Sequence, residues 1–136
     1  MLDENKSVLM KLRLEQSKKC LESALLLSNA DAYKDAANRS YYAIFHAMRA
    51  VLASDCFDSK KHSGIISEFR RSYIKNGIFP KEFSDIIEDA FDARTDSDYN
   101  DFYVVSIDDV TSQIENAKTF LAAVEAFIES KKVSNK

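Results

Sequence analysis

The stretch NRSYYAIFHA at residues 38–47 contains an arginine and a histidine, two side chains that could together bind an anion and transfer a proton. A guanidinium holds phosphate or carboxylate through a fork of N–H donors, and an imidazole titrates near neutral pH. Arg39 and His46 are seven residues apart, which is close to two helical turns, so in a helix they would share one face. Alternatively, Arg39 pairs with an acid and His46 packs at a helix seam.

The composition indicates that helices position these residues. The chain has 136 residues with only two glycines and one proline, and a β-rich domain of this size would need more turn residues. This length fits one domain with a sizeable core. We expect a single all-α domain over residues 1–136, an up-and-down four-helix bundle with an additional short helix, and a frayed tail at 131–136.

Hydrophobic periodicity predicts helices over residues 3–29, 32–54, 62–75, 80–93 and 107–131. Asp31 is placed to cap the second helix, and Gly77 is a natural stop after the third. Pro80 suits the first turn of the fourth helix. Ser106 and Asp109 resemble a capping box with Asp in place of Glu.

The polar and aromatic stretch 94–105 is predicted to be a loop, because it has no clear helical periodicity. Its aromatic side chains would form a lid packed on the end of the bundle, or a surface on which nucleic-acid bases stack. This group consists of Tyr99, Phe102 and Tyr103.

The second helix is predicted to have two unlike faces. Ala43, Ala50 and Ala53 fall on the face of Arg39 and His46, and small residues there would let another helix or subunit approach closely. The opposite face is predicted to be core and consists of Tyr41, Ile44, Phe45, Met48 and Leu52.

The charge balance limits the functions to consider. The net charge is −3, and an acidic chain binds nucleic acid poorly overall, so any RNA contact would be local. No apolar run approaches a membrane span and no secretory pattern is present, so we expect a cytoplasmic protein. Cys20 and Cys56 are expected to be free thiols, and no residue spacing predicts a metal site or a cofactor.

Three motifs occur in a fixed order: RSYYAIFHAMRAVL at 39–52, KKHSG at 60–64 and ARTDSDY at 93–99. Together they resemble the HEPN family of prokaryotic all-α domains, in particular the branch with YYAxFHA, KxHSG and RxxxDY motifs. The resemblance implies a four-helix bundle with a shorter extra helix, often homodimeric. It also implies a minimal nucleotidyltransferase as the antitoxin-like partner in a toxin–antitoxin pair.

Members of this family with an R-x(4–6)-H motif are often metal-independent endoribonucleases, in which Arg and His of two subunits meet at the dimer seam. By its position in the chain that motif corresponds to RTDSDY, where Arg94 is kept and Tyr99 stands in place of the His. Tyrosine titrates about three to four pKa units above histidine, so it is a poor base at neutral pH. Arg94 could still bind phosphate.

The KKHSG motif begins a predicted helix with two lysines and a histidine. Lys61 and His62 could contact a phosphate or nucleotide there, or belong to a solvated basic loop in which His62 helps to cap the helix. Asp98 would orient an Arg or a Lys. The candidate catalytic residues are thus Arg94, His46 and Tyr99, and the candidate binding residues are Arg39, Tyr42, Asp98, Lys61 and His62.

These residues allow two functions of different classes. The first is a toxin-like HEPN protein that acts with the nucleotidyltransferase and cleaves RNA without a metal, with His46 transferring the proton and Arg94 holding the phosphate. The second is a non-catalytic HEPN module that binds a nucleotide or the nucleotidyltransferase. In a third interpretation all these polar residues only join the helices of a structural bundle.

Overall fold

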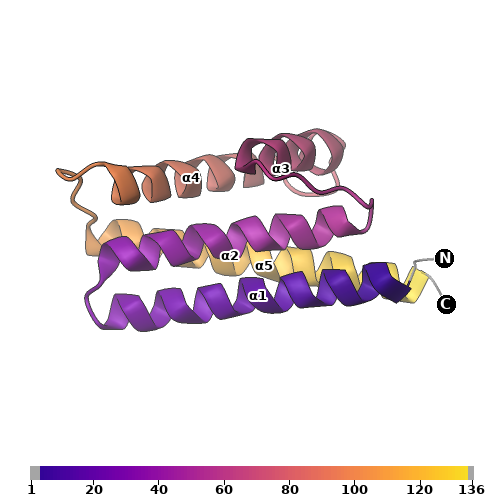
Figure 1. Ribbon diagram of the computed structural model, residues 1–136, viewed down its shortest axis with the longest axis horizontal. Coiled ribbons are helices and arrows are strands. Elements are labelled where there is room, and N and C mark those ends of the chain that lie inside the picture. Colours follow the sequence, from indigo (N-terminus) through magenta and orange to yellow (C-terminus); the bar gives the residue numbers. More distant parts are fainter. Residues whose placement is uncertain (1–3, 135–136) are drawn as a thin grey trace.

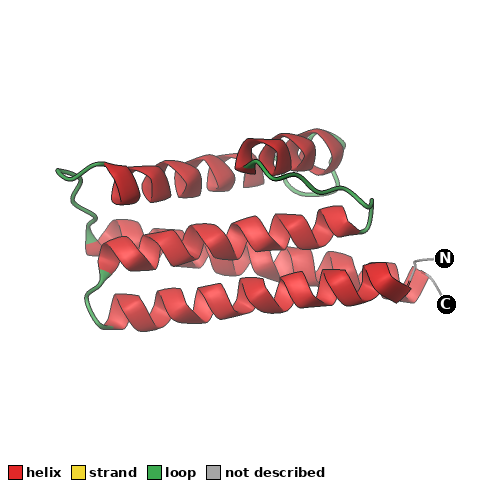
Figure 2. Ribbon diagram, in the orientation of Figure 1, coloured by secondary structure: helices red, strands yellow, loops and turns green. Residues whose placement is uncertain are grey.

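The computed structural model describes residues 4–134, without the side chains of 132–134, and this part of the chain contains no strand (Figure 2). The long helices α1 (Glu4–Asn29), α2 (Tyr33–Ala53) and α5 (Ile107–Ser134) lie side by side along the long axis. On the side of α2 away from α1 lie α3 (His62–Phe69), the π-helical turn η1 (Arg70–Ile74) and α4 (Phe83–Tyr99) (Figure 1). The predicted all-α bundle is therefore confirmed.

Helix α2 is the central element of the bundle and packs against α1, α3, α4 and α5. The face of α2 that was predicted to be core is buried along its whole length. An aromatic cluster joins α3, α4 and α5 to one another, with the Phe120 ring of α5 centred 4.8 Å from Phe83 and 5.6 Å from Phe69. Burying each of these side chains contributes roughly 1.5–3 kcal/mol.

The small residues on the second face of α2 bring α1 close, as predicted for an approaching helix. Ala43 and Ala50 are fully buried, and the hydroxyl of Ser17 on α1 donates a 2.6 Å hydrogen bond to the Ala43 carbonyl oxygen. The Ala43 carbonyl belongs to the backbone of α2, so a short side chain of α1 reaches it only where the two helix backbones lie close together. The alanine stripe is therefore covered by this chain's own first helix.

The fourth helix differs from its prediction at both ends. Pro80 lies in a turn before the helix, where its carbonyl accepts from the Phe83 amide at 3.0 Å. At the other end α4 continues to Tyr99, although residues 94–99 were predicted to be loop. Ala93 continues the buried face of α4, and the i,i+4 ion pair between Arg94 and Asp98 stabilises the last turns of this helix.

Two other helix ends test the capping predictions. Asp31 does not cap α2, because its backbone is left-handed (φ 64°) and its carboxylate accepts from the Tyr33 hydroxyl. Ser106 does cap α5, since its Oγ accepts a 3.0 Å hydrogen bond from the Asp109 amide. Helix α5 runs to Ser134, past its predicted end, and the last two residues of the predicted tail lie outside the described part.

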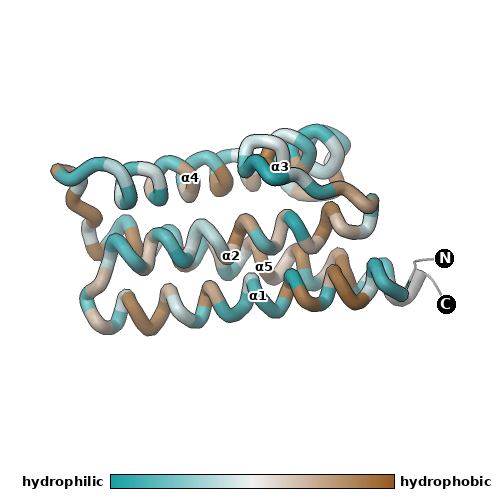
Figure 3. The backbone as a smooth tube through the Cα atoms, in the orientation of Figure 1, coloured by the Kyte–Doolittle hydropathy of each residue, from teal (hydrophilic) through white to brown (hydrophobic). Residues whose placement is uncertain are grey.

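The connection between α4 and α5 is hydrophobic in part (Figure 3). Tyr103 and Val105 pack on a small core cluster with residues of α1, α2 and α5, so the expected lid holds for Tyr103. Phe102 and Tyr99 are not part of this lid, because they are 94% and 74% exposed.

The α2–α3 loop is held against the start of α3 at a glycine. A Cβ on Gly64 would lie 2.4 Å from the Oγ of Ser59, so glycine allows this serine side chain to approach α3 without rotating away. After η1 the chain reverses at Gly77, whose φ of 78° suits glycine and ends the segment as predicted.

Candidate functional site

The partly exposed stripe of α2 runs between α1 and α4, which flank this helix on its two sides (Figure 1). Arginines from all three helices border it. We call this surface the arginine face, and it consists of Arg13 of α1, Arg39, Tyr42, His46 and Arg49 of α2, and Arg94 of α4.

Tyr42 is the centre of the arginine face. The guanidinium carbons of Arg39 and Arg94 lie 4.9 Å and 5.7 Å from its ring centroid, which is a cation–π arrangement for both. Arg94 also donates a 3.3 Å hydrogen bond to the Tyr42 hydroxyl. The His46 ring lies 6.0 Å from the same ring. The structure thus brings Arg39, His46 and Arg94 together around one tyrosine.

A neutral amide, rather than an acid, holds Arg39. Its Nε and one Nη donate to the Asn38 side-chain oxygen at 3.0 Å and 2.6 Å. Asn38 in turn donates to Asp98, whose carboxylate forms the 3.1 Å ion pair with the Arg94 Nε. Asp98 is therefore placed to orient Arg94. No carboxylate in the described part of the chain forms an ion pair with Arg39.

The pKa of His46 reflects its burial and the positive charge of the arginine face. Burial, followed by the charges of Arg49, Arg39 and Arg13, lowers the pKa of its imidazole to about 4. At neutral pH the ring is therefore uncharged. Its Nδ1 is buried, and it has no hydrogen-bond partner among the described residues. Three arginine charges acting on one imidazole mean that the surrounding potential is positive.

His62 is not part of a solvated loop. It is the first residue of α3, its ring stacks on Phe45 at 4.1 Å between centroids, and its Nδ1 shares a 2.8 Å hydrogen bond with the Tyr41 hydroxyl. Burial, and then the charges of Arg94 and Arg49, lower the pKa of His62. The capping role considered for His62 is therefore wrong, and the side chain belongs beside the arginine face.

The remaining two candidates from the sequence, Tyr99 and Lys61, are exposed. Tyr99 contacts Arg94 through its ring at 5.8 Å from the guanidinium carbon, and most of its side chain faces solvent. Lys61 is the N-cap residue of α3 and is exposed.

Three functional candidates were not found from the sequence. Asn38 sits one turn before Tyr42 on the same stripe, and this spacing could have identified it. Arg13 and Arg49 both form ion pairs with Asp58, at 3.2 Å and 3.4 Å, across three separate segments. Helical spacing could not relate those segments to one another.

The charges of the arginine face do not balance. Four guanidinium groups share two carboxylates, those of Asp58 and Asp98, which leaves two positive charges in a chain whose net charge is −3. Positive charge concentrated beside tyrosine and histidine side chains suits an anionic ligand that also has apolar or hydrogen-bonding parts.

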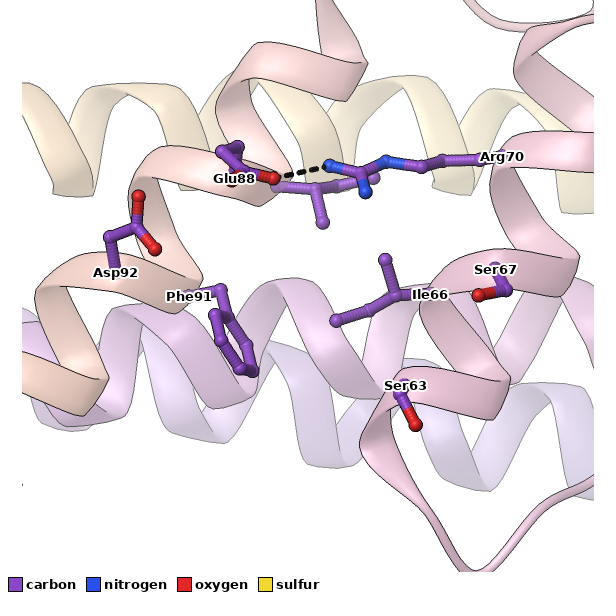
Figure 4. Close-up of a pocket in the computed structure, with 8 residues that line it drawn as sticks. Ser63, Ile66, Ser67, Arg70, Glu88, Phe91 and Asp92 are labelled. Carbon is purple, nitrogen blue, oxygen red and sulfur yellow. Dashed lines mark hydrogen bonds and ion pairs between the residues drawn. The ribbon is translucent and has the colours of Figure 1, made fainter.

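A second region also places an arginine beside an acid. This is the Arg70 cleft, a hollow of about 230 Å³ between α3, η1 and α4. Figure 4 shows Arg70 reaching across it to Glu88, with Ile66 and Phe91 projecting into the space. Arg70 donates to Glu88 at 3.0 Å and to the Ser84 carbonyl at 3.2 Å. The cleft is lined by Ser63, Ile66, Ser67, Arg70, Ile87, Glu88, Phe91 and Asp92.

Within the described residues, no three histidine, cysteine or carboxylate side chains come close enough to ligate a metal ion. Cys20 and Cys56 are free thiols, as expected. None of the described helices has the length and apolarity that crossing a membrane requires.

Known proteins resemble the chain over most of its length. The family model of the HEPN domain matches residues 10–131. A UPF0332 protein of Thermotoga maritima is 32% identical over 86% of this chain and 89% of its own length. A candidate toxin of Methanocaldococcus jannaschii is 28% identical over 88% of this chain and 82% of its own length. A second candidate toxin of that organism is 33% identical over 63% and 64%.

Proposed function

The chain belongs to the HEPN domain family, and on this premise we propose that it is the toxin-like component of a toxin–antitoxin pair and a metal-independent endoribonuclease. The observation that carries the proposal is the convergence of Arg39 and Arg94 on Tyr42, with an excess of positive charge around His46. Relatives named as candidate toxins support the first half of the proposal.

Each residue has one task in the proposed reaction. Arg39 and Arg94 hold the scissile phosphate and neutralise the charge that builds up on it. His46 takes the proton of the ribose 2′-hydroxyl, the 2′-oxygen bonds to phosphorus, and the bond from phosphorus to the 5′-oxygen breaks. The Tyr99 hydroxyl gives its proton to that leaving oxygen. The products are a 2′,3′-cyclic phosphate and a 5′-hydroxyl end.

The arginines explain how His46 becomes a useful base only when substrate is bound. In the free protein its low pKa keeps the ring neutral but makes it a weak base. Burial is the largest cause of the low pKa, and Arg39 is one of the charges that add to it, so a phosphate bound beside Arg39 raises the pKa toward the working pH. Proton transfer is then coupled to substrate binding.

The proposed partner is a minimal nucleotidyltransferase acting as antitoxin, and the proposed assembly of this chain is a homodimer. Membership of the family supports both proposals, and the toxin names of two relatives support an antitoxin partner. The dimer is tested by the mass in solution, which should be about twice the 15.4 kDa of one chain. A monomer at micromolar concentration would contradict it.

One observation favours a second function, a non-catalytic module that binds a nucleotide or the nucleotidyltransferase. Tyr99 stands where the family's ribonuclease motif has histidine, and only its ring contacts Arg94. In this case the arginine face binds phosphate but transfers no proton.

Cleavage of labelled total RNA in EDTA separates the two functions. The purified wild-type chain is compared with His46→Ala, Arg94→Ala and the control Lys118→Ala, which removes an exposed lysine of α5 paired with Glu115. We expect cleavage by the wild type and by the control, and loss of about 100-fold or more in both site variants. RNA binding without cleavage would establish the module instead, and neither activity would reject both functions.

A further inference from the structure

The arginine face has a second cationic end, beyond His46 and away from Arg39 and Arg94. There Arg13 of α1 donates to the Arg49 carbonyl at 3.1 Å and to Asp58 at 3.2 Å. Arg49 approaches the same oxygen of Asp58, at 3.4 Å. Two guanidinium groups therefore share one carboxylate oxygen.

The other oxygen of Asp58 is already used, because it accepts a 2.9 Å hydrogen bond from the Ser59 amide. Asp58 thus supplies one negative charge for two guanidinium groups, and both of its oxygens already accept hydrogen bonds. Arg13 is only 7% exposed, and a buried charge without full compensation is costly unless a ligand or partner supplies the missing anion.

There is room for an anion beside Arg13 and Asp58, the ion pair to which Arg49 also contributes. A hollow of about 340 Å³ opens between the first turns of α1, the end of α2 and the loop that follows. Its cationic lining is Lys6 and Arg13, and its one acidic lining residue is Asp58. The side chains of Phe57 and Leu9 form an apolar wall of this hollow.

The two ends are separated by a distance that selects the ligand. Arg39 and Arg49 are ten residues apart on α2, which corresponds to about 15 Å along the helix axis. A stacked single strand rises about 3.4 Å per nucleotide, so about four nucleotides cover this distance. A single phosphate reaches only one end.

We propose that Arg13, Arg49 and Lys6 form a second phosphate subsite, and that the ligand of the arginine face is an extended single-stranded oligonucleotide held at both ends rather than a mononucleotide. This inference rests on the proposed function, because it takes the Arg39–Arg94 end as the first phosphate site. Tyr42 and His46 lie between the two subsites, where a nucleotide of the bound strand would contact their rings.

The test measures fluorescence anisotropy of labelled 2′-O-methyl oligouridylates with two and eight nucleotides, which bind as RNA does but have no free 2′-hydroxyl. We expect the eight-nucleotide strand to bind at least about tenfold more tightly than the dinucleotide. Arg49→Gln should weaken the long strand about fivefold or more and leave the dinucleotide unchanged. Arg49 is chosen because Arg13 is buried, so its loss could affect folding.

A variant of opposite sign keeps the inference falsifiable. Asp58→Asn removes the shared negative charge while its amide oxygen can still accept from Ser59, so it should tighten binding of the long strand. Lys118→Gln on α5 is the control and should change neither affinity. Circular dichroism confirms that each variant is folded.

The outcomes separate this inference from the proposed function. Equal affinities for the two strands, or an Arg49→Gln variant that binds both like the wild type, would overturn the second subsite alone, provided that Arg39→Gln still weakens the dinucleotide. If the wild type binds neither strand, or if Arg39→Gln and Arg94→Gln have no effect on either, the proposed function is wrong as well.

Discussion

The arginine face and the Arg70 cleft both place an arginine beside a carboxylate, yet their local potentials have opposite signs. At the arginine face, burial and three arginines lower the pKa of His46. In the cleft, burial followed by Glu88, Asp96 and Asp89 raises the pKa of Asp92. The first region disfavours added positive charge and the second disfavours added negative charge.

This contrast shows why a hollow alone does not identify a binding site. The Arg70 cleft is a formed pocket, but its arginine is already paired with Glu88 and a further acid, Asp92, lies beside it. At the arginine face, Arg39 forms no ion pair with a carboxylate of the described residues, and two arginines share Asp58. Unbalanced charge, rather than shape, distinguishes the surface that suits a phosphate ligand.

The largest expected difference comes from the same substitution made in each region. Arg39→Gln should weaken binding of an eight-nucleotide 2′-O-methyl strand about tenfold, which is about 1.4 kcal/mol, because it removes a cation without a paired acid. Arg70→Gln should change the affinity less than twofold. Anisotropy titrations measure both, and equal losses would remove the distinction between the two regions.

The salt dependence of oligonucleotide affinity tests the same comparison, because it gives the number of phosphate contacts. For a single strand the slope of log K against log salt concentration is about −0.7 for each phosphate neutralised. Losing Arg39 should make the slope shallower by about 0.7, whereas Arg71→Gln, which removes an η1 arginine paired with Glu68, should leave it unchanged. A steep slope that no arginine-face variant reduces would place the contacts elsewhere.

The pH dependence of stability tests, without any ligand, the lowered pKa that burial and the arginine charges give to His46. The pKa of His46 is about 4 in the folded chain and about 6.5 when unfolded, so the unfolded state binds the extra proton between these values. Stability is therefore fully present above pH 6.5 and decreases as the pH falls toward 4.

Because the His46 side chain is partly exposed, this decrease should be on the order of 1 kcal/mol after allowance for screening by solvent. Urea unfolding at several pH values measures it, with His46→Asn as the reference for the carboxylates that titrate in the same range. If both proteins lose stability equally, the pKa of His46 is not lowered in the folded chain.

The smallest expected effect concerns the hydroxyl of Tyr42. Its bond to Arg94 is long, at 3.3 Å, and the ring contacts to both arginines remain in Tyr42→Phe. We therefore expect a two- to threefold loss of oligonucleotide affinity. Tyr42→Ala, which also removes the ring, should lose clearly more, and identical losses would show that the ring has no part in binding.

The sequence predicted the fold well because its signals are local and repeated. Apolar spacing along α2 identified its buried face, and the order of three motifs identified the family. The same reasoning failed at residues 94–99, where a polar helical turn is stabilised by one ion pair and by burial of Ala93 rather than by apolar periodicity.

The candidate site was only partly predictable for a related reason. Residues on one helix face, such as Arg39, Tyr42 and His46, could be grouped by spacing alone. Contacts between segments distant in sequence could not be predicted from spacing. The ion pairs of Asp58 with Arg13 and Arg49 are therefore seen only in the structure. Their charge balance depends on tertiary contacts that spacing does not encode.

The most direct test of the positive arginine face is an NMR titration of the two histidines, free and with the eight-nucleotide 2′-O-methyl strand. His62→Gln assigns the signals, because the chain has no other histidine besides His46. The account predicts a His46 pKa near 4 in the free protein that rises by about one pH unit or more when the strand binds. A pKa near 6.5 that the strand does not change would contradict it.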